Sequence, residues 1–225
     1  MAGSPEGEGA ESRTVNARRT AFALIVLLFG SGALALPTLP DRVPIHWNVA
    51  GEPDGWASPW VGVFALPLVG LGMWGFLVGI RRIMDLEERA AADRFLDALI
   101  LGLTIAWAIL HGLILASYLG WPLPMDVTAL AFLVMGGLLA WTGRWMVRLG
   151  ESDEGLVLVS LPTDDPELKR GVLRMGAATM VWAGVTMAAA AAFGPRARLL
   201  LLTIGIVPAG ILFPIWALWK AARSG

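Results

Sequence analysis

The chain has 225 residues, of which 56% are hydrophobic and only 16% are charged, and its mean hydropathy is +0.67. Soluble domains carry about 25% charged residues, so this composition indicates an integral membrane protein. The net charge of −1 provides no field that would attract nucleic acid, and the absence of cysteine excludes disulfides, thiolate nucleophiles and cysteine-ligated metals.

The N-terminal segment, residues 1–19, is rich in Gly, Ser and Glu. It has little apolar surface to bury, so we predict a disordered cytoplasmic tail. An Ala33-Leu34-Ala35 pattern follows in the first apolar run and resembles a signal-peptide cleavage site. The acidic leader is atypical of a signal peptide, so we favour retention of this run as a membrane span.

Six apolar segments approach or exceed the roughly 20 residues that a helix needs to cross a bilayer. They are residues 20–37, 61–80, 98–120, 127–147, 172–193 and 199–219. Lipid offers no partners to backbone amides, so each segment is expected to be a helix. The predicted fold is therefore an all-α polytopic membrane bundle with about six transmembrane helices.

The distribution of Lys and Arg predicts the orientation of this bundle. If the N-terminus lies inside, every Lys and Arg except Arg42, Arg196 and Arg198 falls on the inner side. The positive-inside rule then places both termini in the cytoplasm and residues 38–60 outside the bacterial cytoplasmic membrane.

That outer loop holds the densest set of polar and aromatic residues in the chain. Its prolines restrict the loop, and Gly51 and Gly55 are expected to turn the backbone with positive φ. The candidate ligand-binding residues are His46, Trp47, Asn48, Gly51, Glu52, Asp54 and Gly55. Two other interpretations remain: a purely structural turn in which the carboxylates cap backbone amides, and a weak divalent-cation site at His46.

The motif Pro44-x-His46-Trp47-Asn48-x-x-Gly51-x-x-Asp54-Gly55 after a first span resembles the N-terminal domain of SdpI-type bacterial membrane proteins. The resemblance covers about residues 20–85, and residues 143–150 lack the run expected in the second half of that family. It implies a domain of two helices and an outer loop at 20–85, followed by a four-helix membrane region at 86–225. It also implies roles in immunity against a secreted peptide toxin, or in sensing that toxin and signalling to a cytoplasmic repressor.

His111 is the candidate functional residue within the membrane. It lies near the middle of the third span and shares a helical face with Thr104 and Trp107. Ionisable residues within a bilayer are functional candidates by default, although a neutral histidine bonded to a neighbouring helix is the simpler interpretation. Kinks at Pro67, Pro208 and Pro214 are expected in the second and sixth spans.

The inner connections also contain patterns. Residues 81–97 carry opposite charges at i,i+4 (Arg81–Asp85, Asp85–Arg89 and Arg89–Asp93) and are predicted to form an amphipathic helix. A cytoplasmic regulator is a candidate partner for it. In the next inner connection, residues 156–159 could form a short strand, and Asp165-Pro166 indicates a helix start.

Small residues at a spacing of four predict close helix packing. The pairs are Gly75 and Gly79, Gly136 and Ala140, and Gly184 and Ala188.

These observations favour a non-enzymatic membrane protein whose outer loop recognises an extracellular peptide or envelope protein. Its expected partners are the lipid bilayer and that ligand, with no cofactor, metal or nucleic acid. The alternative is a small transporter or channel subunit that uses His111. A third hypothesis, a membrane-embedded hydrolase with a metal at His46, has few ligands to support it.

Overall fold

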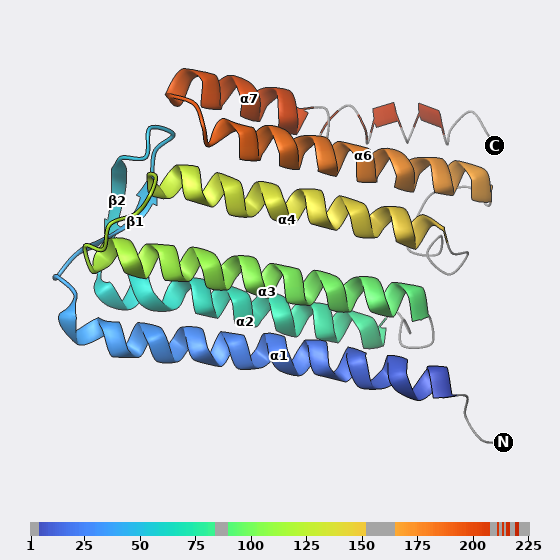
Figure 1. Cartoon of the computed structure of the whole chain (residues 1–225), viewed down its shortest axis with the longest axis horizontal. Coiled ribbons are helices and arrows are strands. Elements are labelled where there is room, and N and C mark those ends of the chain that lie inside the picture. The colour runs from blue at the N-terminus through green and yellow to red at the C-terminus, as the bar shows by residue number, and fades with distance from the viewer. Residues whose placement is uncertain are drawn as a thin grey trace. The chain divides into compact units, whose positions relative to one another are not determined.

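The computed structural model describes residues 5–83, 90–151 and 165–207, together with residues 211, 213, 215, 216, 219 and 220. Its helices and strands are shown in Figure 1. The helices are α1 (Pro5–Ala35), α2 (Pro59–Ile83), α3 (Ala90–Tyr118), α4 (Val127–Gly150), α6 (Pro166–Ala190) and α7 (Pro195–Val207). A short 3-10 helix, η1 (Leu36–Thr38), and two strands, β1 (Val43–Trp47) and β2 (Pro53–Ala57), connect α1 to α2.

Five of the described helices are long and apolar enough to cross a membrane. These stretches are Ala17–Thr38, Pro59–Arg81, Ala91–Tyr118, Val127–Gly150 and Pro166–Ala190. The prediction of an all-α membrane bundle is therefore confirmed. The sixth predicted span, residues 199–219, begins within α7. Several of its later residues lie outside the described residues, and Pro208 and Pro214 are among them.

The chain divides into two compact units. The N-terminal unit contains residues 1–45 and 56–121, and the C-terminal unit contains residues 46–55 and 122–225. In the N-terminal unit, α1, α2 and α3 all pack against one another. Ile25, Val63 and Ile100, one from each helix, are almost completely buried, so this three-helix unit has its own apolar core.

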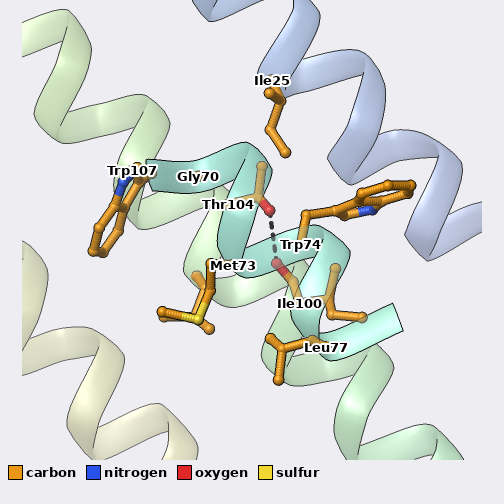
Figure 2. A pocket seen from close by; sticks show the side chains of 9 residues that line it. Ile25, Gly70, Met73, Trp74, Leu77, Ile100, Thr104 and Trp107 are labelled. Atoms are coloured by element: carbon orange, nitrogen blue, oxygen red, sulfur yellow. Dashed lines mark hydrogen bonds between the residues drawn. The ribbon is translucent and has the colours of Figure 1, made fainter. Parts of the chain in front are cut away.

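Figure 2 shows the middle of that three-helix core. The indole of Trp107 packs against Gly70. A Cβ added to Gly70 would lie 3.3 Å from Cδ1 of Trp107, so a larger residue there would crowd the indole. Thr104 donates a hydrogen bond to the carbonyl of Ile100 at 2.8 Å, so its hydroxyl is satisfied within α3. The remaining cavity is about 10 Å³, room for about one water molecule.

A buried network of charges joins α1, α2 and α3. Arg81 is 0% exposed and pairs with Asp93 and Asp97, while Arg18 pairs with the same two carboxylates at 3.1 and 3.0 Å. The prediction of one continuous helix at 81–97 is therefore wrong, because Arg81 and Asp97 are too far apart along a single helix to pair. The predicted pairs of Arg81 with Asp85 and of Asp93 with Arg89 stay predictions, since Asp85 and Arg89 lie outside the described residues. Arg81 lies near the end of α2 and the carboxylates near the start of α3, so the attraction acts across helices. Residues 84–89, with the other partners predicted there, lie outside the described residues.

In the C-terminal unit, α4 and α6 pack through small residues. A Cβ on Gly136 would meet the carbonyl of Gly184 at 2.5 Å and the amide of Ala188 at 2.7 Å. The predicted small-residue pairs on these two helices thus form one shared interface, in which the backbones approach closely. No atom lies within 4 Å of a Cβ placed on Gly75 or Gly79, so the third predicted pair makes no such contact among the described residues.

Helix starts follow the sequence signals. Asp165 caps α6 by accepting a hydrogen bond from the amide of Glu167, with Pro166 in the first turn, as predicted. The strand expected at 156–159 lies outside the described residues. Asp126 caps α4 in the same way through the amide of Ala129 at 2.8 Å.

The N-terminal segment differs from the expectation. We predicted disorder for residues 1–19, but α1 begins at Pro5 and continues without a break into the first span. The apolar part supplies a helix nucleus that extends easily. Proline is favoured in the first turn of a helix, which agrees with the start of α1 at Pro5.

Candidate functional site

The loop that the sequence singled out is a β-hairpin rather than an irregular loop. Strands β1 and β2 pair with each other as a two-stranded sheet. The β1 residues Val43, Ile45 and Trp47 favour extended backbone. Pro44 and Pro53 lack an amide hydrogen, which a two-stranded sheet tolerates because each strand has a free edge. The hairpin was not predicted, because a short strand interrupted by proline gives little periodic signal.

Asn48 organises the turn between the strands. Its Oδ1 accepts hydrogen bonds from the amides of Ala50 and Glu52 at 2.9 and 3.0 Å. Its Nδ2 donates to Oε2 of Glu52 at 3.1 Å. Two backbone hydrogen bonds close the same turn, from Asn48 to Glu52 and from Gly51 to Asn48, both at 2.9 Å. The turn therefore has one preferred shape, set largely by a single side chain.

The tip of the hairpin is fixed within the C-terminal unit by three side chains. Arg198 donates to the carbonyl of Val49 at 3.0 Å and forms a two-armed ion pair with Asp126 at 2.7 and 3.1 Å. Thr128 donates to the carbonyl of Asn48 at 3.0 Å. A planar guanidinium that holds a carboxylate with two hydrogen bonds is a geometrically specific clamp.

The charge of Asp126 is stabilised by this clamp. Partial burial raises the pKa of its carboxyl group, but the hydrogen bond from Arg198, the amide of Ala129 and the positive charge of Arg198 outweigh that effect. The net result is a pKa below the ordinary value for aspartate. The clamp therefore stays ionised at neutral pH.

Gly51 and Gly55 of the motif are required for different structural reasons. Gly51 has φ +86°, and a Cβ on it would lie 2.5 Å from Oδ1 of Asp126, so both conformation and space require glycine. Gly55 does not have the positive φ that we predicted for it. A Cβ there would lie 2.8 Å from the Cβ of His46, so Gly55 instead makes room for the histidine on the opposite strand.

The base of the hairpin is fixed within the N-terminal unit. Val43 is completely buried, and Tyr118 at the end of α3 donates a hydrogen bond to the carbonyl of Pro44 at 2.8 Å. Gly62 lies beneath, because a Cβ on it would reach the hydroxyl of Tyr118 at 3.0 Å. The hairpin thus has supports at its base as well as at its tip.

His46 and Asp54 form an exposed pair on opposite strands. Nδ1 of His46 lies 2.5 Å from Oδ1 of Asp54, and the two side chains are 70% and 45% exposed. An ionised carboxylate only accepts, so the ring donates from Nδ1. When the imidazole is neutral, Nε2 is then a hydrogen-bond acceptor. Trp47, next in the chain, is half-buried. The pair is thus an oriented polar group on a fixed turn.

The same residues give little support to a metal centre. Oε2 of Glu52 already accepts a hydrogen bond from the side-chain amide of Asn48. Among the described residues, no three His, Cys, Asp or Glu side chains gather closely enough to hold a metal ion.

His111 lies in the N-terminal unit. It is 1% exposed, and its ring lies close to the carbonyl of Leu28, although neither ring nitrogen has a hydrogen-bond partner in the described part of the chain. It borders a groove of about 520 Å³ between α1 and α3, with Ser31 and Thr38 on the same lining. An unpaired imidazole in an apolar site is costly, which keeps His111 a functional candidate.

Sequence reasoning missed the residues that hold the hairpin. Asp126 stands just before an apolar helix, a recognisable cap signal, but nothing local indicates that it also binds Arg198. Arg198 was counted only as an outer positive charge. Tyr118 is 74 positions from its partner Pro44, too far for a spacing argument.

The comparisons with known proteins cover only this region. The family model described as a domain of unknown function (DUF1648) matches residues 23–71. These residues comprise most of the membrane part of α1, the hairpin and the first half of α2. No curated protein and no solved structure matches the chain.

Proposed function

We propose that this protein is a non-enzymatic receptor of the bacterial cytoplasmic membrane whose hairpin binds an extracellular ligand. The ligand we favour is a secreted peptide or an envelope protein, and the role is immunity or sensing. The observation that carries the proposal is the His46–Asp54 pair, exposed on a turn that Asn48 and Arg198 hold in one shape. A preorganised polar surface binds with little loss of conformational entropy.

The chemistry of the pair supports binding rather than catalysis. A Ser-His-Asp arrangement needs a hydroxyl bonded to the histidine. Within the described residues, Asp54 is the hydrogen-bond partner of His46, and no hydroxyl side chain shares that role. Nε2 can accept a hydrogen bond from a ligand amide or ammonium, while Asp54 and Glu52 favour a positively charged partner.

Ligand binding could be transmitted through the N-terminal unit. The base of the hairpin leads through η1 into α1 and directly into α2. Arg18 lies near the start of the apolar part of α1, and Arg81 lies near the end of α2. Both arginines pair with Asp93 and Asp97. A ligand that binds one position of the hairpin more tightly than another would shift the packing of α1 and α2, to the extent of that difference in affinity. A cytoplasmic regulator would respond to the shift at the charge network.

The test is protection of sensitive bacterial cells from the peptide fraction of spent medium from the source bacterium. Expression of the wild-type chain should raise the peptide concentration that halves growth. The double variant His46→Ala/Asp54→Ala should lose that protection, while Asp41→Ala, which removes an exposed charge outside the strands, should keep it. Equal protection by all three proteins, at equal membrane levels, would rule out the hairpin pair as the recognition site.

A small transporter or channel subunit is the second candidate, favoured by His111 and the groove beside it. Proton flux into proteoliposomes, followed with a pH-sensitive dye, would distinguish the two functions. A receptor predicts no flux above empty vesicles. A transporter predicts flux that His111→Leu abolishes and His46→Ala does not.

A further inference from the structure

Two arginines and two tryptophans line a groove near the C-terminal end of α4. The groove has a volume of about 340 Å³, and its lining consists of Ala140, Trp141, Arg144, Trp145 and Arg148. The two indoles meet edge to face with ring centroids 6.1 Å apart. The guanidinium of Arg148 lies 5.1 Å from the ring centroid of Trp145, a cation–π contact that orients its charge.

Neither arginine has a carboxylate partner in the described part of the chain. Both are exposed, and the ion pairs there involve Arg18, Arg81, Arg170, Arg198 and His46 instead. The face of α4 that packs on α6 is marked by Gly136 and Gly143, and it adjoins the groove at Ala140. Within the described residues, two positive charges therefore lie side by side without a carboxylate partner.

The position of the groove along α4 matches the level of lipid headgroups. Val127 is the first residue of the apolar stretch Val127–Gly150, which is long enough to cross a membrane. At 1.5 Å per residue, Arg144 lies about 26 Å and Arg148 about 32 Å further along, close to the hydrocarbon thickness of roughly 30 Å. Tryptophan prefers this level because its indole has both an apolar body and an N–H donor.

We propose that this groove binds the headgroup of an anionic phospholipid in the leaflet reached by the C-terminal end of α4. The phosphate would accept hydrogen bonds from Arg144 and Arg148, and the acyl chains would extend along the apolar surface beside Trp141. The predicted topology makes this the cytoplasmic leaflet. The proposal is independent of the ligand proposed for the hairpin.

Native mass spectrometry of the full chain in detergent, with added phosphatidylglycerol or phosphatidylcholine, tests this site. The wild type should retain phosphatidylglycerol in preference to phosphatidylcholine. Arg144→Gln/Arg148→Gln should lower retention of phosphatidylglycerol by roughly tenfold or more. Arg144→Lys/Arg148→Lys should retain most of it, because the charge is kept.

The matched control is Arg174→Gln/Arg196→Gln, which removes the same charge from two other exposed positions and should change retention by less than about twofold. Circular dichroism and thermal unfolding would show that all variants are folded. Equal losses in both glutamine doubles would mean general attraction instead of a site. Displacement of phosphatidylglycerol by millimolar inorganic phosphate would mean a soluble-anion site, and either result would overturn the proposal.

Discussion

Asn48 and Gly51 fix the shape of the hairpin tip at the scale of single residues. The side chain of Asn48 satisfies two amides that would otherwise face solvent, and Gly51 provides a left-handed conformation against Asp126. The motif residues His46 and Asp54 then project from a turn whose shape they do not themselves determine. In this motif, the residues that set the turn lie between the two residues of the exposed pair.

Gly51→Ala should destabilise the C-terminal unit by about 1 kcal/mol or more, because alanine disfavours φ +86° and its Cβ would collide with Asp126. The thermal unfolding midpoint in detergent would measure this loss. Gly137→Ala is the control, since no atom lies within 4 Å of its added Cβ and the helix should be unaffected or slightly stabilised. Equal midpoints for the two variants would contradict the described turn.

The clamp between Asp126 and Arg198 should weaken in acid. The pKa of Asp126 is lower in the folded protein than its ordinary value of about 3.9. Its ionised form therefore contributes stability fully above about pH 4, and this contribution is lost as the pH falls through the folded-state pKa. Proteolysis at the hairpin between pH 3 and pH 7 would reveal the change. Asp126→Asn should be readily cleaved at both pH values, and a wild-type hairpin protected equally at pH 3 would oppose this account.

At the scale of helices, different interactions stabilise the inside of each unit. Small residues let the backbones of α4 and α6 meet, where dispersion contacts dominate. The α1–α2–α3 unit adds a buried charge network of Arg18, Arg81, Asp93 and Asp97 to its apolar core. A network of this kind fixes helix register, because any slip leaves a charge without its partner.

Asp97→Asn should destabilise the three-helix unit by about 3 kcal/mol, because buried Arg81 loses one of its carboxylate partners. The double variant Arg81→Met/Asp97→Leu removes opposite charges together and leaves Arg18 paired with Asp93. It should therefore unfold at a higher temperature than Asp97→Asn. If the double variant is less stable than the single, the network does not act through charge compensation.

The sequence predicts these elements unequally. Long apolar runs identify the spans because lipid leaves the backbone no alternative to helix. The spacing of four residues from Gly136 to Ala140, and from Gly184 to Ala188, identifies a packing face. Asp165-Pro166 similarly indicates the start of α6. The partners of Arg81 and Arg198 were not predictable, because such contacts join residues far apart in the chain and depend on which helices become neighbours.

At the scale of the whole molecule, the account is a membrane protein that holds a rigid polar hairpin at a bilayer surface. The hairpin was recognised from the sequence as the candidate site, although as a loop. The distribution of Lys and Arg predicts that the hairpin lies outside the membrane, with only Arg42, Arg196 and Arg198 on that side. The receptor proposal depends on that orientation.

Labelling of single introduced cysteines in intact bacterial cells tests this orientation most directly, because the chain has no cysteine of its own. Ala50→Cys places a thiol on the exposed hairpin tip, and Glu167→Cys places one on the exposed start of α6. A membrane-impermeant maleimide should label position 50 in intact cells and position 167 only after permeabilisation. The reverse pattern would place the hairpin in the cytoplasm and contradict recognition of an extracellular ligand.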